Sequence, residues 1–354
     1  MSFDWITGPV PLPSSEHRER AVARQTQLTK PAGALGRMET VAIELAALQQ
    51  RDRPAAAHVP VLVFAGDHGV TAQAISAYPQ EVTVQMLHNF AAGGAAIAVL
   101  ARALDLPLQV IDAGSVAEQA IAGVLTDKPC RGTRDFSRDA AMSEGELAHA
   151  LSAGRRALMA IPHADLVVLG EMGIGNTTVA SALACALTGL SPAQLVGAGT
   201  GLDEARMAHK RHVVEQALAL HRDAMTDQSA PAWETLRRLG GLEIAAMVGA
   251  MIAAAQRGLP VLVDGFIVSV AALVAVNLQP GVRPWLLFSH QSAERGHAHV
   301  LAALQAQPLL QLDLRLGEGS GAALAVPLLR LACALHNGMA TFADAAVSNR
   351  EDLG

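Results

Sequence analysis

The sequence contains few aromatic and few charged residues. Phe, Trp and Tyr make up 3% of the 354 residues, and Asp, Glu, Lys and Arg make up 16%. So few aromatic side chains leave little for the bases of single-stranded nucleic acid to stack on. The formal net charge of −6 provides no basic surface for binding a duplex. We therefore expect no nucleic-acid partner.

Cysteine is also scarce. Cys130, Cys185 and Cys333 are far apart, and none belongs to a CxxC pair. An odd, scattered set indicates reduced thiols in a cytoplasmic protein rather than a disulfide framework or a zinc knuckle. The first residues show no cationic stretch followed by an apolar one, so we expect no signal peptide.

No apolar run is long enough to span a bilayer. The two longest candidates, Ile244–Ala255 and Phe266–Val276, are well short of the ~20 residues that a spanning helix needs. We therefore expect no membrane span. Hydrophobic residues nevertheless make up 51% of the chain, which is ample for a large core. Part of this apolar surface is expected to be buried between subunits.

Short runs rich in Val, Leu and Ile end abruptly at Gly or Asp, as buried strands of a parallel sheet do. Five are clear and the sixth, which alternates, is weaker: VPVLVFAGDHG from Val59, LQVIDAG from Leu108, ADLVVLGEMG from Ala164, LPVLVDGF from Leu259, PWLLFSH from Pro284, and LLQLDLRLGEG from Leu309.

Alanine-rich stretches with helical spacing lie between these runs, at Thr177–Leu187, Gly241–Gln256 and Glu294–Leu304. Strand, glycine turn and helix in repetition predict an α/β fold: a doubly wound, mostly parallel sheet with flanking helices. Ligands of such sheets bind at the carboxyl ends of the strands. The glycines and acidic residues that end the runs are expected to lie there.

The chain ends differ from the middle. Helical patterns cover Glu16–Gln27 and Met38–Gln50, and a further one begins at Gly321. We expect a main α/β domain at residues 50–320, and a small helical subdomain formed by residues 1–49 together with 321–354.

The segment GEMGIGNTT follows a predicted strand directly. Gly173 and Gly175 allow a tight turn and close approach of a ligand to the backbone. Asn176 or Thr177 can cap the next helix, whose free N–H groups would bind an anion. The segment contains no Walker lysine and no GxGxxG pattern, so an ordinary strand-to-helix turn remains an alternative.

Two further glycine clusters carry charged residues. Lys210 follows GAGTG (197–201) by about two helical turns, and either folds back toward a phosphate or is solvated on its helix. Glu318 lies in GEGSG at the end of a predicted strand. If it is partly desolvated, its pKa rises and it can accept a proton from a heterocyclic N–H; otherwise it is a turn glutamate in water.

Two other functions need comparison. Asp67, His68, His290 and His297 suggest a metal-dependent hydrolase, but HExxH is absent and His297 and His299 do not share a helix face, so structural roles are favoured. A nucleotide sensor would use the GIGNTT loop alone. A separate carboxylate flanked by glycines disfavours it, because a binding protein has no need of that group.

Taken together, the motifs resemble one family, the nicotinate-nucleotide–dimethylbenzimidazole phosphoribosyltransferases of cobalamin nucleotide-loop assembly. The resemblance runs over nearly the whole chain in order: TKPAGALGRMET, FAGDHGV, SAYPQEVTVQMLHNFAAGGAAI, the GT-x-D-F stretch at 132–136, GEMGIGNTT, GAGTGLD, GGLEIAAMVGAM, VLVDGFIVSVAAL, SHQSAERGH and LRLGEGSGAALAVPLL.

The resemblance implies a reaction. Ribose 5-phosphate would move from nicotinate mononucleotide to 5,6-dimethylbenzimidazole with inversion at C1′, giving α-ribazole 5′-phosphate and nicotinate. Glu318 would be the general base, and Glu171 would match the second carboxylate of the site. Nicotinate leaves from a pyridinium, so no pyrophosphate has to be neutralised by a metal ion. We expect no metal ion and no cofactor.

The resemblance also implies binding residues and a homodimer. The phosphate and ribose would be held by Gly173, Gly175, Asn176, Thr177, Thr178, Gly199 and Lys210. The aromatic base would be held by Tyr78, Pro79 and Gln85.

Overall fold

The computed structural model describes residues 4–197, 203–226 and 232–348. Within these residues six parallel strands form one sheet in the order β3-β2-β1-β4-β5-β6. The strands are β1 (Val61–Gly66), β2 (Leu108–Gly114), β3 (Leu125–Thr126), β4 (Val167–Met172), β5 (Val261–Val263) and β6 (Leu286–Phe288). The predicted doubly wound α/β fold is confirmed, and so are the five clear strands.

The sixth predicted strand is wrong. The segment from Leu309 contributes only an isolated parallel bridge between Leu310 and His290. At Asp313 the backbone enters the left-handed region, with φ of 54°, which breaks an extended run. The sixth strand is instead β3, at the opposite edge of the sheet. Its two residues are both exposed, so no apolar run marked it in the sequence.

Helices connect the strands, as expected of a doubly wound fold. They are α1 (Ser15–Gln27), α2 (Arg37–Gln49), α3 (Glu81–Ala92), α4 (Ala96–Leu104), α5 (Glu144–Met159), α6 (Asn176–Thr188), α7 (Pro192–Leu195), α8 (Glu204–Thr226), α9 (Ala232–Leu239), α10 (Leu242–Arg257), α11 (Phe266–Leu278), α12 (His297–Ala303), α13 (Ser320–Gly338) and α14 (Phe342–Ala345). Short 3₁₀ helices are η1 (Asp4–Thr7), η2 (Gly69–Gln73) and η3 (Pro280–Trp285). The predicted helices are confirmed, although α12 begins three residues later than expected.

Small residues allow close packing around the buried helix α10. A Cβ added to Gly154 of α5 would lie 1.7 Å from the carbonyl oxygen of Ala246 in α10. A Cβ on Gly249 of α10 would lie 1.9 Å from the carbonyl oxygen of Leu151. The two helix backbones are therefore in contact, which explains why this region is rich in Ala and Gly.

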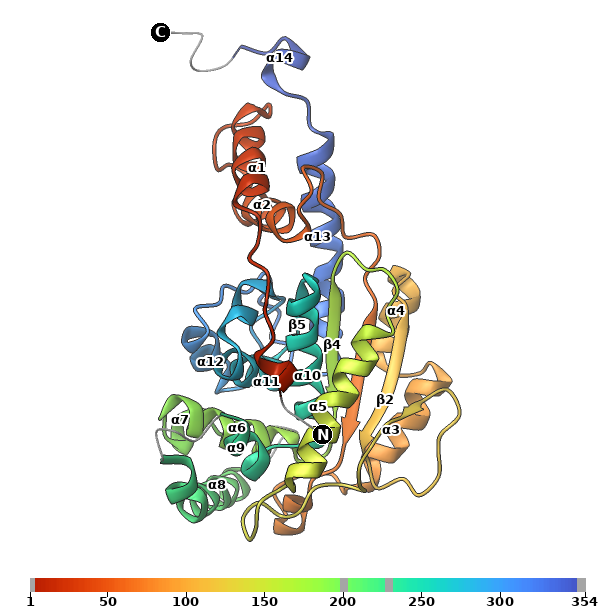
Figure 1. The fold of residues 1–354 in the computed structure, drawn as a ribbon, viewed down its shortest axis with the longest axis vertical. Coiled ribbons are helices and arrows are strands. Elements are labelled where there is room, and N and C mark those ends of the chain that lie inside the picture. The colour runs from red at the N-terminus through yellow and green to blue at the C-terminus, as the bar shows by residue number, and fades with distance from the viewer. Residues whose placement is uncertain (1–3, 198–202, 227–231, 349–354) are drawn as a thin grey trace.

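The chain ends lie side by side. Figure 1 shows α1 and α2 beside the second half of α13, projecting from the body that holds the sheet. Arg24 Nε donates to the carbonyl of His336 at 2.7 Å, and Leu28 forms an antiparallel bridge with Thr341. Because α13 is one continuous helix whose first turn lies in the main body, the division at residues 49 and 320 stays a prediction.

One stretch of the described residues, 81–104, is long and apolar enough to cross a membrane by length and composition alone. Within this stretch Gly93 adopts a left-handed conformation, with φ of 78°, and separates α3 from α4. Neither helix reaches the ~20 residues that a spanning helix needs.

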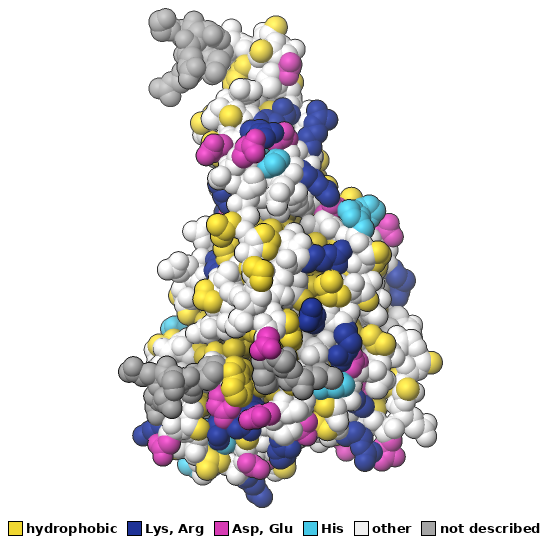
Figure 2. All heavy atoms as spheres, in the orientation of Figure 1, with side chains coloured by type: hydrophobic (Ala, Val, Ile, Leu, Met, Phe, Trp, Pro, Cys, Tyr) yellow, Lys and Arg dark blue, Asp and Glu magenta, His cyan; other side chains and the backbone are white. Residues whose placement is uncertain are grey.

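Acidic and basic side chains are mixed on the face drawn in Figure 2, and apolar side chains lie between them.

Candidate active site

A cavity of about 470 Å³ opens at the carboxyl edge of the sheet. Its walls come from the ends of β4, β5 and β6, from the segments that follow them, and from α3 with the loop before it. The lining residues are Tyr78, Val82, Met86, Glu171, Met172, Gly173, Ile174, Asn176, Thr177, Gly265, Phe266, Ile267, His290, Ser292, Glu294, Arg315, Leu316, Gly317 and Glu318. This is the place where ligands of doubly wound sheets bind.

Glu318 enters the cavity from a tight turn in front of α13. Gly317, Glu318 and Gly319 all have positive φ, of 90°, 65° and 83°. Its side-chain Oε2 accepts a hydrogen bond at 3.3 Å from the N–H of Ile97, in the first turn of α4. Glu318 is only 5% exposed, so the alternative of a glutamate in water is excluded.

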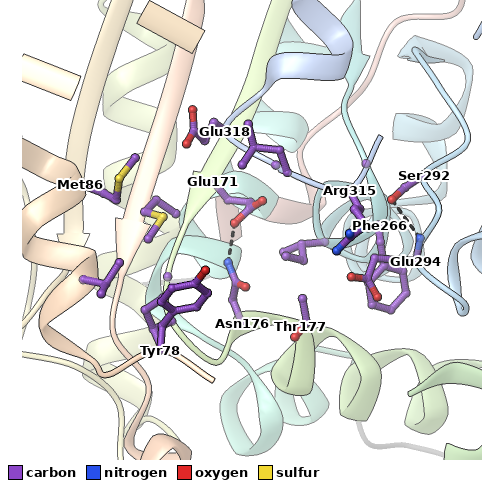
Figure 3. Close-up of a pocket in the computed structure, with 18 of the residues that line it drawn as sticks. Tyr78, Met86, Glu171, Asn176, Thr177, Phe266, Ser292, Glu294, Arg315 and Glu318 are labelled. Atoms are coloured by element: carbon purple, nitrogen blue, oxygen red, sulfur yellow. Dashed lines mark hydrogen bonds between the residues drawn. The ribbon is translucent and has the colours of Figure 1, made fainter. Parts of the chain in front are cut away.

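Glu171 lies next to it on β4. The backbone carbonyl of Glu171 accepts from the N–H of Glu318 at 3.2 Å, so the two residues are joined through the main chain. The side chain of Asn176 donates a hydrogen bond to Glu171 Oε2, as Figure 3 shows. A Cβ on Gly317 would lie 2.2 Å from Glu171 Oε1, so a side chain at this position would displace the carboxylate.

Both carboxyl groups hold their protons more tightly than free glutamate does. Burial raises the pKa of Glu171 to about 8, with further contributions from the negative charges of Asp264, Glu243 and Glu318. Burial also raises the pKa of Glu318, against the opposing effect of the Ile97 N–H. Such perturbed, paired carboxyls are typical of acid–base sites.

The GEMGIGNTT segment forms the turn from β4 into α6. The N-cap of the helix is Gly175, with φ of 93° and no side-chain cap hydrogen bond, so the expectation that Asn176 or Thr177 caps it is wrong. The turn depends on glycine at this position because residues with a side chain rarely adopt positive φ. A Cβ on Gly173 would lie 2.3 Å from the carbonyl oxygen of Gly66. Asn176 and Thr177 line the cavity, whereas Thr178 is fully buried and is not part of its wall.

Lys210 folds back toward this turn, as one of the two alternatives predicted. Its Nζ donates to Thr177 Oγ1 at 2.8 Å, and the residue is 1% exposed. Burial lowers its pKa to about 8, against the opposing charge of Glu294. The ammonium group thus lies directly behind a hydroxyl of the cavity wall. Gly199 lies outside the described residues.

Of the three residues expected to hold the aromatic base, one lines the cavity and two do not. Tyr78 lines the cavity although it is 53% exposed. Pro79 and Gln85 are exposed and are not among the lining residues, so their role stays a prediction. On α3 the cavity is instead lined by Val82 and Met86, which are one helical turn apart.

Sequence reasoning missed the opposite wall of the cavity. Figure 3 shows Phe266, Ser292, Glu294 and Arg315 there, facing Tyr78 and Met86 across the two glutamates. All four lie in segments already noted in the sequence: LPVLVDGF ends at Phe266, SHQSAERGH contains Ser292 and Glu294, and LRLGEG contains Arg315. The available signal was the position of Ser292 and Glu294, polar residues that follow the predicted strand PWLLFSH.

The histidines do not form the metal site of the hydrolase hypothesis. His68 Nε2 lies 3.0 Å from Glu243 Oε1, whereas His297 Nε2 is bonded to Ser269 Oγ at 2.9 Å. Burial lowers the pKa of His290 to about 4 and that of His297 to about 3, so both are neutral near pH 7. Within the part of the chain that the structure describes, no group of three or more His, Cys, Asp or Glu side chains is arranged to hold a metal ion.

Residues 10–347 of the chain that forms this cavity match a family model described as phosphoribosyltransferase. The protein is therefore an enzyme of the phosphoribosyltransferase class.

Whole-chain comparisons identify the family within this class. A protein of Bradyrhizobium sp. (strain ORS 278), named nicotinate-nucleotide–dimethylbenzimidazole phosphoribosyltransferase, is 63% identical over 98% of this chain and 99% of its own. A Pseudomonas aeruginosa protein of the same name is 57% identical over 99% of both chains. The crystal structure of the Thermus thermophilus protein of that name superimposes with a TM-score of 0.89, at 44% identity over 95% of this chain and 99% of its own. The chain belongs to the nicotinate-nucleotide–dimethylbenzimidazole phosphoribosyltransferase family. This membership overturns the hydrolase and sensor alternatives.

Proposed function

We propose that the enzyme transfers ribose 5-phosphate from nicotinate mononucleotide to 5,6-dimethylbenzimidazole, with inversion at C1′, giving α-ribazole 5′-phosphate and nicotinate. The observation that carries this proposal is the pair of buried carboxyl groups, Glu318 and Glu171, between an apolar and a polar wall of one cavity. The same reaction places the enzyme in the assembly of the lower ligand of cobalamin.

The two walls suit the two substrates. Tyr78, Val82 and Met86 form an apolar surface for the benzimidazole ring. The ribotide phosphate would bind near Thr177, at the start of α6, because helix N-termini and cations bind anions. Lys210 lies behind Thr177, and Arg315 lies on the wall opposite Tyr78.

The reaction needs one proton acceptor. A benzimidazole nitrogen forms a bond to C1′ while the bond from C1′ to the nicotinate nitrogen breaks on the opposite face of the ribose. The ring N–H proton passes to the Glu318 carboxylate and from there to solvent. Because burial raises the pKa of Glu318, the ionised form is a stronger base than an exposed glutamate.

Glu171 supports the ribose in this proposal. With a pKa of about 8 it carries a proton near pH 7 and can donate a hydrogen bond to a ribose hydroxyl. Asn176, bonded to its Oε2, holds the side chain in place. Positioning two substrates in line supplies the rest of the rate acceleration.

The experiment is to incubate the protein with nicotinate mononucleotide and 5,6-dimethylbenzimidazole, with and without a chelator, and to analyse the products by mass and anomeric configuration. Release of nicotinate with formation of the α-ribotide is expected in both samples. A β-ribotide would refute inversion. Absence of product from folded protein would refute the proposed reaction.

We also propose that the enzyme is a cytoplasmic homodimer. Its three cysteines are free, as in a reducing compartment. Val99 of α4 and Leu324 and Leu331 of α13 expose 48%, 37% and 54% of their surface, on two helices that pack together. Sedimentation is expected to give a dimer, and Leu331→Asp is expected to shift it toward monomer. A wild-type protein that sediments only as a monomer would contradict this proposal.

A further inference from the structure

The turn that presents Glu318 is conformationally unfavourable. Gly317 and Gly319 adopt positive φ at little cost, but Glu318, with φ of 65°, carries a side chain and does not. A residue in this conformation persists only where its surroundings fix it. The contacts that hold the turn therefore decide where the carboxyl group of Glu318 lies.

Asp264 supplies these contacts on one side. It follows β5 directly and is 1% exposed. Its Oδ2 accepts from the N–H of Gly319 at 3.1 Å, and its Oδ1 accepts from the N–H of Ala322 at 2.8 Å. One carboxylate thus joins the residue after Glu318 to the first turn of α13, where a negative charge is favourable.

Strand β4 holds the turn on the other side. A Cβ added to Gly170 would lie 2.4 Å from the carbonyl oxygen of Glu318, so the turn rests directly on the strand backbone. The N–H of Ile97 fixes the end of the Glu318 side chain. The backbone of Glu318 is therefore clamped between Gly170 and Asp264, and its carboxylate is directed into the cavity.

We propose that Asp264 is a positioning residue for Glu318: its buried carboxylate fixes the turn that directs Glu318 into the cavity, and its negative charge acts on the base. This inference rests on the role of Glu318 in the proposed transfer reaction.

The charged and titratable groups around Asp264 come from several elements. Glu171 and Glu318 are both affected by its charge, which raises the pKa of each. His290 Nδ1, after β6, lies 3.7 Å from Asp264 Oδ1, but that ring is neutral near pH 7 because burial lowers its pKa to about 4.

Glu243 of α10 also acts on Glu171, and Arg315 lines the outer part of the same cavity. Burial raises the pKa of Asp264 itself to about 6, while backbone N–H groups oppose the shift. Above that pH Asp264 is ionised and makes Glu318 a stronger base.

The test compares Asp264→Asn with wild type in kcat, in KM for both substrates and in the pH dependence of kcat. Asparagine removes the charge and turns an NH₂ group toward a backbone N–H. We expect kcat to fall about 10–100-fold, as for a displaced reacting group, with little change in KM for the ribotide. The acidic limb of the kcat profile is expected to move to lower pH by about one unit, because a nearby negative charge is lost.

Asp165→Asn is the matched control. Asp165 is also buried, at 3% exposure, and its Oδ2 accepts from the N–H groups of Ala57 and His58, away from the cavity. We expect this variant to lose thermal stability without any shift of the kcat profile. An equal shift in both variants, or an unmoved profile in Asp264→Asn, would overturn the proposal.

Asp264→Glu separates charge from geometry and carries the test if Asp264→Asn does not fold. It keeps the charge but displaces the turn, so kcat is expected to fall while the pH profile stays near that of wild type. Wild-type kcat in this variant would overturn the positioning role.

A measurement without turnover distinguishes this inference from the proposed reaction. The ¹³C resonance of the Glu318 carboxyl group, assigned with Glu318→Gln, is titrated in wild type and in Asp264→Asn. We expect a lower titration midpoint in the variant, even if the protein makes no ribotide. An unchanged midpoint would refute the effect of Asp264 on Glu318, whereas failure of wild type to form product would refute the reaction alone.

Discussion

Replacing Glu318 with glutamine tests the proposed base directly. In the wild type, the N–H of Ile97 donates to Glu318 Oε2 at 3.3 Å. Glutamine has nearly the same shape, and its side-chain oxygen can still accept this hydrogen bond. The cavity wall therefore remains intact while the proton acceptor is lost. General base catalysis contributes about 10²–10⁴-fold to a rate. At 1.36 kcal/mol for each factor of ten, the barrier should rise by about 3–5 kcal/mol.

The loss should appear in kcat, with KM for nicotinate mononucleotide nearly unchanged, because Glu318 lies on the side of the cavity near Met86, away from Thr177 and Arg315. The wild-type kcat should fall as the pH drops through the raised pKa of Glu318, since only the ionised carboxylate accepts a proton. In Glu318→Gln this acidic limb should disappear.

The assay measures initial rates of nicotinate release and α-ribotide formation over a range of pH. Glu144→Gln, an exposed position in the first turn of α5, serves as the control and should match wild type. If Glu318→Gln is folded and keeps more than about a tenth of wild-type kcat, the base assignment is refuted, because the loss would fall below the range for general base catalysis.

Three further predictions concern the cavity wall and its neighbours. Thr177→Val should raise KM for the ribotide about 10–100-fold, the value of a hydrogen bond to a charged group. Thr178→Val should leave KM unchanged and should not lower stability, because the buried Thr178 hydroxyl has no hydrogen-bond partner among the described residues. Equal effects of the two substitutions on KM would relocate the phosphate site. Glu171 has a folded-state pKa of about 8 against 4.5 for free glutamate, so its contribution to stability is complete below about pH 4.5 and is lost as pH rises through 8. In thermal unfolding, Glu171→Gln should therefore gain stability relative to wild type as the pH rises. A difference in stability that does not change with pH would contradict the raised pKa of Glu171. Gly170→Ala should lower kcat about 100-fold by displacing the Glu318 turn. The control Gly145→Ala, whose new Cβ meets nothing within 4 Å, should keep wild-type activity. A fully active Gly170→Ala would show that the turn tolerates displacement.

Glu318 shows how far local sequence patterns lead. A glutamate between glycines after an apolar run is compatible with either an exposed or a buried carboxyl group, and exposure is the commoner outcome for a single glutamate. Burial is decided by α4, whose N-terminal turn reaches Glu318 from a position 221 residues earlier in the chain. Lys210 is similar: its sequence allowed a solvated side chain, and only the packing of α8 against the α6 turn brought it to Thr177.

The amino-acid pattern alone was enough to predict the repeating strand–turn–helix units, because continuous apolar runs and glycine breaks are local features that follow from burial and backbone conformation. Motifs that resemble one family also predicted which residues of the carboxyl edge line the cavity, among them Glu171, Thr177 and Glu318. Folding in three dimensions settled what depends on distant contacts. It placed the short exposed strand β3, joined Asp264 to the turn of Glu318, and set Phe266, Ser292, Glu294 and Arg315 opposite Tyr78. These pairings connect residues far apart in the chain, so no local pattern of apolar and polar residues specifies them.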